Sequence, residues 1–574
     1  MRGRFTAALA AAVLVAIVGA GLAPAPPVAA ASRTTVPTRI PAEPMSPKKG
    51  LLQQHLTTGR AVARAMPQVA SSVTCDSTGR TVASPNIGAS RNNLNGIAAV
   101  APNDVWTVGT YINGSSVFQT LAEHWDGSAW SVITTPNVGA GNNVLAATAA
   151  LSAGDVWAVG FSRPDNSSAA QPLTEHWNGN GWTVVPTPPR TSASSIALYG
   201  VSADASNDVW AVGIAFDSQY SAQPFVLRWN GSVWAVAVAP VAQVRTGGLN
   251  LSGLNGVKVL SANDVLVVGD GADFTGTTQV SPDTAFSNRW NGSFWSSISV
   301  PVHPNSDFLI DVQGTANDLW TVGGQGQAGS TTSDNVLIEH LTGTGWTDSP
   351  GATPGLSANL FGLGYLAADN IYAVGVSATA NPGTAGELDS TVIERWNGSN
   401  WSLVSSENPS ANDGLVAIAA ISANDVWTAG FMTLNGYPQT LTEIVCALPV
   451  VTNVVPSSGT AGTTVAITGS GFSRAIDVEF GSTPAFTFHV VSDTQITAVS
   501  PGHKAGTVDI RVTVQGTSAT SSADQFTYQV ARTGSAAEPG TAHFQSRTPV
   551  PPPPVFFPTS PRFRTIARGA PIPI

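Results

Sequence analysis

The nine residues Ala101-Pro102-Asn103-Asp104-Val105-Trp106-Thr107-Val108-Gly109 return six more times along the chain. The later copies begin at residues 152, 205, 261, 315, 367 and 422 and read SAGDVWAVG, ASNDVWAVG, SANDVLVVG, TANDLWTVG, AADNIYAVG and SANDVWTAG. From copy to copy the Asp position, which is Asn370 in the sixth, advances by 51, 53, 56, 54, 52 and 55 residues. A regular period above twenty residues indicates a repeat architecture.

Each repeat contains four strand-like runs, which we call strands a to d. In the first repeat they are Gly96–Val100, Val105–Tyr111, Thr120–Trp125 and Trp130–Thr134. Strands c and d flank the pattern Trp-Asn/Asp-Gly-x-x-Trp, and Asn-Gly or Asp-Gly predicts a hairpin in which both central residues have positive φ. Seven four-stranded antiparallel units of about fifty residues predict an all-β fold, a seven-bladed β-propeller over residues 72–447.

All sixteen tryptophans occupy three positions of the repeat, one after Asp-Val and two around the c–d turn. Because they follow the period, we expect them to pack between blades, with a carbohydrate-stacking platform as the alternative. The repeated aspartates are interpreted as structural turn residues, whose carboxylates accept backbone N–H bonds, rather than as a metal-binding ring. They are Asp104, Asp155, Asp208, Asp264, Asp318 and Asp425. The strand-c pairs Glu123-His124, Glu175-His176, Glu339-His340 and Glu394-Arg395 predict ion pairs between blades.

The chain begins with the features of a secretory signal peptide over residues 1–31. Arg2 and Arg4 precede an apolar run, which ends in the small residues Val28-Ala29-Ala30-Ala31. Residues 32–70 are interpreted as a linker or pro-segment, and no later run is apolar enough to span a bilayer. The sequence therefore predicts a secreted, extracellular protein, either free or associated with the cell wall. Residues 71–530 carry a net charge of −21 and no basic cluster, which argues against a nucleic-acid partner.

Residues 448–529 predict a separate immunoglobulin-like β-sandwich, because short alternating strands are separated by Gly and Pro turns. The tail from residue 530 to 574 is rich in proline, and we expect it to be extended and largely disordered.

Two family resemblances follow from these motifs. The nonapeptide resembles the Asn-Asp-Val-Trp-Ala-Val-Gly repeat of secreted bacterial propellers, and it is similar to kelch and galactose-oxidase propellers in shape only. Residues 448–529 resemble an IPT/TIG domain through Pro456-Ser457-Ser458-Gly459-Thr460-Ala461-Gly462, Gly469-Ser470-Gly471-Phe472 and Phe480-Gly481. That resemblance implies a binding or spacer module of surface proteins and of some carbohydrate-active enzymes, without catalysis of its own.

No recognised catalytic motif, cofactor loop or metal-ligand spacing is present, so the sequence predicts no cofactor. The first hypothesis is a binding or adhesion protein for an extracellular glycan or surface protein. The alternative is an extracellular polysaccharide-directed hydrolase or lyase, which would need acids in the irregular loops. The candidates are Asp165, Asp217, Asp270, Asp273, Asp283, Glu387 and Asp389.

The connections between strands differ at the two ends of each blade. The a–b and c–d turns are short and uniform, whereas the b–c and d–a connections vary, as in Gly269–Phe286 against Phe161–Pro172. Variable loops on a rigid scaffold are where binding residues concentrate. We therefore expect the ligand on the b–c/d–a face.

The seventh repeat contains strands a to c and then ends at Cys446. The run Val82–Gly88 matches the first strand d, Ile133–Gly139, at an offset of 51, so it is predicted to close the ring as the missing strand. Under the corresponding alignments Cys75 and Cys446 both fall on Asp126, in the c–d turn. In an exported chain an even number of cysteines favours a disulfide, and we predict a Cys75–Cys446 bond in place of that turn.

Overall fold

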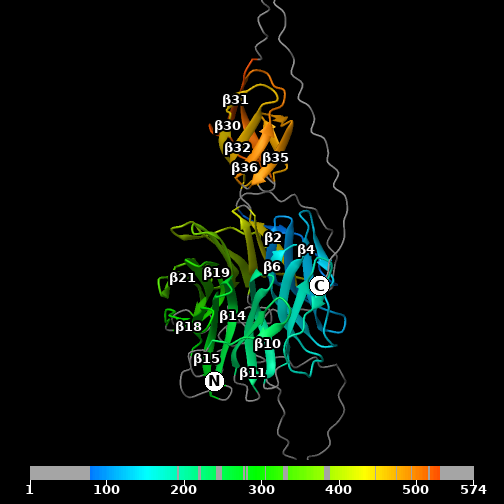
Figure 1. Cartoon of the computed structure of the whole chain (residues 1–574), viewed down its shortest axis with the longest axis vertical. Helices are drawn as coiled ribbons and strands as arrows, with labels where there is room; N and C mark the ends of the chain where they lie inside the picture. Colours follow the sequence, from blue (N-terminus) through cyan, green and yellow to red (C-terminus); the bar gives the residue numbers. More distant parts are fainter. Residues whose placement is uncertain are drawn as a thin grey trace, which may run out of the picture. The chain divides into compact units, whose positions relative to one another are not determined.

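The computed structural model describes residues 78–530, apart from 89, 190–192, 218–221, 241–248, 276–277, 280–281, 304, 327–333, 381–387, 424, 446–447, 473–474, 493 and 515–516. All regular secondary structure in these residues is β-strand (Figure 1). No helix in this described part is long and apolar enough to cross a membrane. Strands β2 to β29 together with β1 form the propeller, and β30 to β38 form the sandwich.

The strands of the first three blades follow the order a to d. Blade 1 contains β2 (Asn92–Ala101), β3 (Asp104–Ile112), β4 (Phe118–Trp125) and β5 (Trp130–Ile133). Blade 2 contains β6 (Asn143–Ser152), β7 (Asp155–Ser162), β8 (Gln171–Trp177) and β9 (Trp182–Val184). Blade 3 contains β10 (Ala193–Ala205), β11 (Asp208–Asp217), β12 (Ala222–Trp229) and β13 (Trp234–Val236).

Blades 4 to 6 repeat this order, with one short additional strand, β16 (Thr278–Gln279), paired with β15. Blade 4 contains β14 (Leu249–Ser261), β15 (Asp264–Thr275), β17 (Thr284–Trp290) and β18 (Trp295–Ile298). Blade 5 contains β19 (Asp307–Thr315), β20 (Asp318–Gly326), β21 (Asp334–Thr342) and β22 (Gly345–Asp348). Blade 6 contains β23 (Ser357–Ala367), β24 (Asn370–Ala380), β25 (Leu388–Trp396) and β26 (Trp401–Leu403).

Blade 7 is built from both ends of the propeller sequence. Its strands are β27 (Asp413–Ser422), β28 (Asp425–Leu434), β29 (Tyr437–Val445) and β1 (Gly79–Val82), in the sheet order β1-β29-β28-β27. β1 lies antiparallel to β29 with Val82 opposite Thr442 and Gly79 opposite Val445. Each inner strand contacts those of both neighbouring blades, in the circular order β2, β6, β10, β14, β19, β23, β27 and back to β2. The seven sheets therefore form a closed ring.

The final glycine of the nonapeptide is required by a close approach between strands a and b. Strand a of the first blade has a register shift between Leu94 and Gly96, and the same shift recurs in every blade. Opposite it, a Cβ on Gly109 would overlap the carbonyl oxygen of Asn93, and the glycines of the other six copies face the same overlap. Only glycine fits this position, which explains why it recurs with the period.

The tryptophans pack between neighbouring blades. The strand-b Trp of one blade contacts the strand-c and strand-d Trp of the next, as in Trp106 with Trp177 and Trp182 at ring-centroid distances of 4.8 and 5.6 Å. Four other seams have such a triad: Trp157–Trp229–Trp234, Trp210–Trp290–Trp295, Trp320–Trp396–Trp401 and Trp427–Trp125–Trp130. The strand-b members of these triads are 0 to 2% exposed, so they are core residues and offer no stacking platform.

The c–d turns differ from the predicted hairpin. Four residues lie between the paired Trp125 and Trp130, and only the glycine of each turn has positive φ, for example Gly127 at 97°. The preceding Asn or Asp carries the turn instead, because its side-chain oxygen accepts the backbone N–H groups two and three residues later. This is seen for Asp126, Asn178, Asn230, Asn291 and Asn397. An Asx turn satisfies these N–H groups without a second left-handed residue.

The sandwich begins at β30, after the chain leaves blade 7. One sheet has the order β30-β32-β36-β35 and the other has the order β31-β38-β37-β33-β34. The first contains β30 (Val450–Val455), β32 (Thr464–Ser470), β36 (Gln495–Val499) and β35 (Thr487–Ser492). The second contains β31 (Ser458–Gly459), β38 (Gln525–Tyr528), β37 (Gly506–Thr513), β33 (Asp477–Phe480) and β34 (Thr483–Pro484). The two sheets bury an apolar core that includes Ile467, Phe472, Phe480, Ile496 and Phe526.

Candidate functional site

The two ends of the blades carry different structures. At one end the a–b and c–d turns are short, with closing pairs such as Ala101–Asp104 and Trp125–Trp130. At the other end the b–c connections are long and unequal: β15 ends at Thr275 and β17 begins at Thr284, whereas β28 ends at Leu434 and β29 begins at Tyr437.

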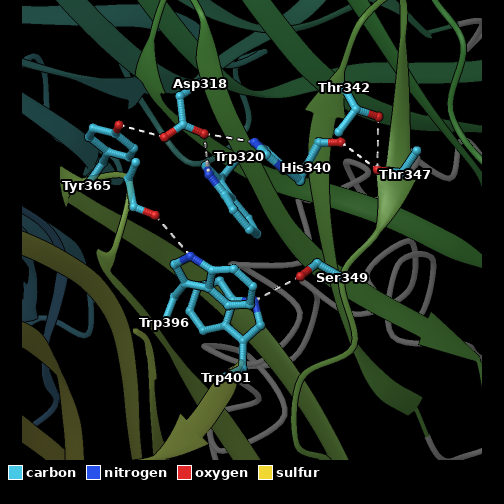
Figure 2. Close-up of polar contacts among 10 residues, drawn as sticks. Asp318, Trp320, His340, Thr342, Thr347, Ser349, Tyr365, Trp396 and Trp401 are labelled. Carbon is cyan, nitrogen blue, oxygen red and sulfur yellow. Dashed lines mark hydrogen bonds and ion pairs between the residues drawn. The ribbon is translucent and has the colours of Figure 1, made fainter. Parts of the chain in front are cut away.

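At the short-turn end, the repeated aspartate is bound to its own blade by a side-chain network. Asp318 Oδ1 accepts hydrogen bonds from Trp320 Nε1 at 2.9 Å and contacts His340 Nε2 at 2.8 Å, and Figure 2 shows the three side chains converging. The His340 ring lies parallel to Trp320 at 4.1 Å. The carboxylate therefore fixes both the indole and the imidazole that covers it.

The same network recurs around the ring. Asp104 and Asp155 bind His124 and His176 at 2.8 Å. Asp208 and Asp264 bind Arg228 and Arg289 at 2.6 Å. In blade 6 Asn370 accepts from Arg395 at 3.0 Å. The partners of the five aspartates are thus side chains of strands b and c in the same blade. The Asx turn expected of the repeated aspartates is formed by the Asn or Asp of the c–d turn. The expected ion pairs between blades are wrong, because strands b and c of one blade are hydrogen-bonded neighbours and place the Asp beside the His or Arg.

Blade 5 adds one contact to this network. Tyr365, on strand β23 of blade 6, donates its hydroxyl to Asp318 Oδ2 at 2.7 Å (Figure 2), and burial followed by this carboxylate raises the pKa of Tyr365 to about 12. The hydrogen bonds from Tyr365, His340 and Trp320 lower the pKa of Asp318 although its partial burial opposes them. Asp318 is therefore an ionised acceptor that connects two blades.

Replacing Tyr365 with Phe should lower the free energy of unfolding by about 1.5 kcal/mol, because a hydrogen bond to a charged group is lost. Urea unfolding at pH 7 measures the change. Tyr372→Phe is the matched control, since among the described residues the Tyr372 hydroxyl reaches only the Ala423 carbonyl, at 3.5 Å. Equal losses in the two variants would contradict the role given to the Asp318 contact.

The candidate loop acids lie at the long-connection end, but only some come together. Asp165 is fully exposed and binds Ser167 and Ser168 within its own loop, and these hydrogen bonds lower its pKa to about 2. Asp217 ends β11. Asp273 lies in β15 but its side chain is not among the described ones, and Glu387 lies outside the described residues. Asp270 lies within β15, and Asp283 and Asp389 lie at the start of strand c in their blades.

Three consecutive blades have an aspartate at the start of strand c. Asp283, Asp334 and Asp389 are 1, 8 and 2% exposed, and the corresponding residues of the other blades are Phe118, Ala170, Ala222 and Pro438. The backbone N–H of each aspartate donates to a residue next to the following strand a: Ser306 at 3.2 Å, Ser357 at 2.8 Å and Asn412 at 3.0 Å. The three acids therefore lie where each blade meets the next.

The acids are densest between blades 4 and 5. Asp270 accepts from Asn255 Nδ2 at 2.7 Å, and the same nitrogen donates to the Leu309 carbonyl of blade 5 at 2.8 Å. Burial, opposed by the Asn255 bond and reinforced by Asp307, raises the pKa of Asp270 to about 7. Burial and the neighbouring Asp270, Asp307 and Asp334 raise the pKa of Asp283 well above its usual range. We call Asp270, Asp283, Asp307 and Asp334 the acidic seam.

A histidine stands beside the acidic seam. His303 Nδ1 lies 3.0 Å from Asp307 and its Nε2 lies 3.3 Å from Asp348. The hydrogen bond to Asp307 outweighs burial and raises the pKa of His303 to about 9, so the imidazole is cationic at neutral pH. Asp307 also accepts from the Ala285 N–H at 3.2 Å. Asp307 is therefore paired with the cationic His303, whereas burial favours the neutral form of Asp283.

The same seam departs from the repeat at its other end. Leu266 replaces the strand-b Trp and contributes to a core cluster with Leu309 and Trp346, so no Trp triad forms. Lys258 stands where five of the other six inner strands have Ala, Ser or Gly. Burial lowers the pKa of Lys258, and Asp311 of blade 5 opposes this shift. Asp311 in turn accepts from the Leu363 N–H at 2.9 Å. Blades 4 and 5 thus meet through polar groups where most blades meet through indoles.

Sequence reasoning missed Asp307, Asp334 and His303. Asp334 occupies the same repeat position as Asp283 and Asp389, so aligning the strand-c starts would have found it, whereas the approach of His303 to Asp307 depends on the d–a connection. Within the described ranges no three His, Cys, Asp or Glu side chains are arranged to hold a metal ion. Neutral and ionised carboxyl groups side by side can both donate and accept hydrogen bonds.

Comparisons with known proteins describe the two parts separately. Residues 449–528 match the IPT/TIG domain family, and the C-terminal sandwich is an IPT/TIG domain. No curated protein matches the sequence. Among solved structures, YCF48 from Cyanidioschyzon merolae is 13% identical with a TM-score of 0.37, covering 64% of this chain and 98% of its own. A polysaccharide lyase of family PL25, an ulvan lyase bound to a saccharide, is 10% identical with a TM-score of 0.43, covering 64% and 96%. A fungal alcohol oxidase of the AA5 family in complex with copper is 13% identical with a TM-score of 0.35, covering 79% and 100%.

Proposed function

We propose that this chain is a secreted or cell-surface binding protein, which recognises an extracellular glycan or surface protein through the b–c/d–a face of its propeller. The IPT/TIG domain would serve as a spacer or an auxiliary binder. The observation that supports this proposal is the acidic seam between blades 4 and 5, where the otherwise regular scaffold carries non-repeating polar groups. Binding residues concentrate where variable connections sit on a rigid frame.

The chemistry of the seam suits a ligand rich in hydroxyl or cationic groups. The half-buried Asp270 and the buried Asp307 accept hydrogen bonds, and a neutral Asp283 carboxyl also donates one. A few polar groups in a largely apolar surrounding fix the orientation of a small ligand. Here the acids are the polar groups, and Leu309 and Ala285 are part of the apolar surrounding. Residues 71–530 carry a net charge of −21, which argues against phosphate-rich partners.

Shortening the connection between β15 and β17 to a tight turn should weaken ligand binding at least tenfold and leave the thermal unfolding midpoint unchanged. The measurement is a glycan array with the full chain, followed by titration of each glycan that binds. The control replaces Asn291-Gly292 in the c–d turn of the same blade by Asp-Gly, which keeps the Asx acceptor at the opposite end. Loss of binding in the control with retention in the shortened variant would place the ligand on the other face.

A polysaccharide hydrolase or lyase is the second candidate, and the pair Asp283 and Asp270 favours it. An acid kept neutral beside a carboxylate is the arrangement that general acid–base catalysis needs. Turnover of the bound glycans distinguishes the two candidates, because Asp283→Asn should abolish turnover in an enzyme. In a binding protein the same variant changes affinity and there is no turnover to lose.

A further inference from the structure

The strand that closes the ring lacks the two features that hold every other strand d. In blades 1 to 6 a continuous turn connects strand c to strand d. In addition, strand d begins at or next to a tryptophan that packs against the preceding blade, such as Trp130 and Trp182, each 6% exposed. β1 follows no such turn. Its residue at the Trp130 position is Gly79, so β1 buries no indole.

The space beside Gly79 is occupied by a carboxyl group. A Cβ at this position would lie 2.6 Å from Glu443 Oε2 and 2.8 Å from Ile393 Cδ1. Glu443, on β29, is 0% exposed, and both of its oxygens accept from Ser406 Oγ at 2.8 Å. An acid therefore lies directly under the closing strand. The equivalent Glu123 of blade 1 lies beside a strand d that begins with Trp130, whereas Glu443 lies beside a glycine.

Val82 packs on the apolar cluster between blades 7 and 1, and polar contacts add to this attachment of β1. Thr442 donates to the Val82 carbonyl at 2.7 Å, and Thr440 N–H donates to Asn86 at 2.9 Å. On the side of blade 6, Glu407 accepts from Arg80 at 2.9 Å and from the Thr81 N–H at 2.8 Å, with half-exposed side chains in the ion pair. Ion pairs of this exposure contribute little to stability.

The charged groups around Glu443 disfavour its ionisation. Glu407 faces it from the segment after β26 and Asp413 from the start of β27, while the cation Arg80 of β1 is bound to Glu407. From β28 its cross-strand neighbour is Thr428, which carries no charge. Burial, reinforced by Glu407 and Asp413 and opposed by Ser406, raises the pKa of Glu443 to about 7.

We propose that β1 is a latch, which leaves the ring while β27, β28 and β29 remain folded, and that ionisation of Glu443 opens it. The ionised carboxylate has two acidic neighbours and reaches water by displacing the strand that carries Gly79. Opening exposes the edge of β29, a row of unpaired backbone groups to which another strand can add. The closing seam is therefore the place where this propeller opens locally as the pH rises towards 7.

The direction follows from linkage. The closed state holds a proton on Glu443 up to about pH 7, whereas an exposed glutamate loses it near pH 4.5. The equilibrium constant for opening therefore rises with pH between these values and levels off above pH 7. Between pH 5.0 and pH 8.5 this constant rises by on the order of 50-fold.

Hydrogen exchange measured by mass spectrometry on the full chain tests the latch, with rates corrected for intrinsic base catalysis and with reductant present so that no disulfide holds β1. Peptides covering 79–82 should be less protected than those covering 130–133. The protection of the 79–82 peptides should fall as the pH is raised from 5.0 to 8.5, by the same factor as the opening constant rises. Glu443→Gln should remove that pH dependence from β1. Glu123→Gln, the equivalent change in blade 1, should leave it in place.

Protection of β1 that equals that of β5 and is independent of pH would overturn the latch. So would a pH dependence that persists in Glu443→Gln. If Glu443→Gln does not fold, the ratio of β1 to β5 protection in the unaltered protein at pH 5.0 and 8.5 still decides, because the latch requires that ratio to fall.

Discussion

Glu175→Gln is expected to stabilise the protein at alkaline pH. Glu175 lies on strand c at the seam with blade 1 and is 0% exposed, and neither carboxyl oxygen has a hydrogen-bond partner in the described part of the chain. Burial raises its pKa to about 8. An amide of the same shape has no ionised form, so the variant should gain about 3 kcal/mol in the free energy of unfolding on going from pH 5 to pH 8.5, relative to the unaltered protein.

The sign follows from proton binding in the two states. Between about pH 4.5 and pH 8 the folded protein keeps a proton on Glu175 that the unfolded chain releases, so stability falls as pH rises through this window. Burial likewise raises the pKa of Glu339 to about 8 and, against one hydrogen bond each, that of Glu394 and Glu443 to about 7. The ring of strand-c glutamates should therefore make the whole propeller most stable in mild acid.

Urea unfolding of both proteins at pH 5.0, 7.0 and 8.5 measures the effect. Glu407→Gln is the control of opposite sign, because hydrogen bonds from Thr81 and Arg80 lower the pKa of Glu407 against its partial burial. The control should lose less than about 1 kcal/mol, and only above pH 4, as expected for a half-exposed ion pair. A uniform loss of stability in Glu175→Gln at all three pH values would show that the carboxyl makes a contact that the amide cannot replace.

The period of the sequence predicted the fold because the repeat itself carries the structural requirements. Gly109 and its six counterparts lie opposite a register shift, and Trp106 and its counterparts fill the seams. Each requirement lies within one blade or recurs identically between blades, so a single chain with seven copies shows it. The all-β class, the blade boundaries and the IPT/TIG domain were accessible for this reason.

The candidate site was only partly accessible, since it depends on contacts between blades that are not alike. Asp270 and Asp283 were named from the sequence as loop acids, but Asp307 lies at the start of a strand and becomes part of the site only through its approach to His303 and Asp283. The strand-c Glu-His pairs were expected to form ion pairs between blades. Adjacent residues of a strand point to opposite faces, which sends His176 to Asp155 and leaves Glu175 in the seam.

The Cys75–Cys446 disulfide remains a prediction, because both cysteines lie outside the described residues. Its argument rests on the strands that flank them. Gly79 pairs with Val445, at the position that the closing pair Trp130–Trp125 has in the blade 1 hairpin. In the sequence, Cys446 directly follows Val445, and Cys75 lies four residues before Gly79. The two cysteines thus stand at the only c–d end of the ring that no continuous turn closes in the described sheets.

Removing this bond should lower stability more than any other change considered above. In the chain-entropy model, closing a loop of about 370 residues stabilises the folded state by up to roughly 6 kcal/mol. We expect Cys75→Ser, Cys446→Ser and the double variant to lose the same amount in urea unfolding, and reduced unaltered protein to match them. This equality is the control, because two independent core thiols would give additive losses. Peptide mapping of the secreted, unreduced protein should join Cys75 to Cys446, and two free thiols in the denatured chain would show that hydrogen bonds alone hold β1 in the ring.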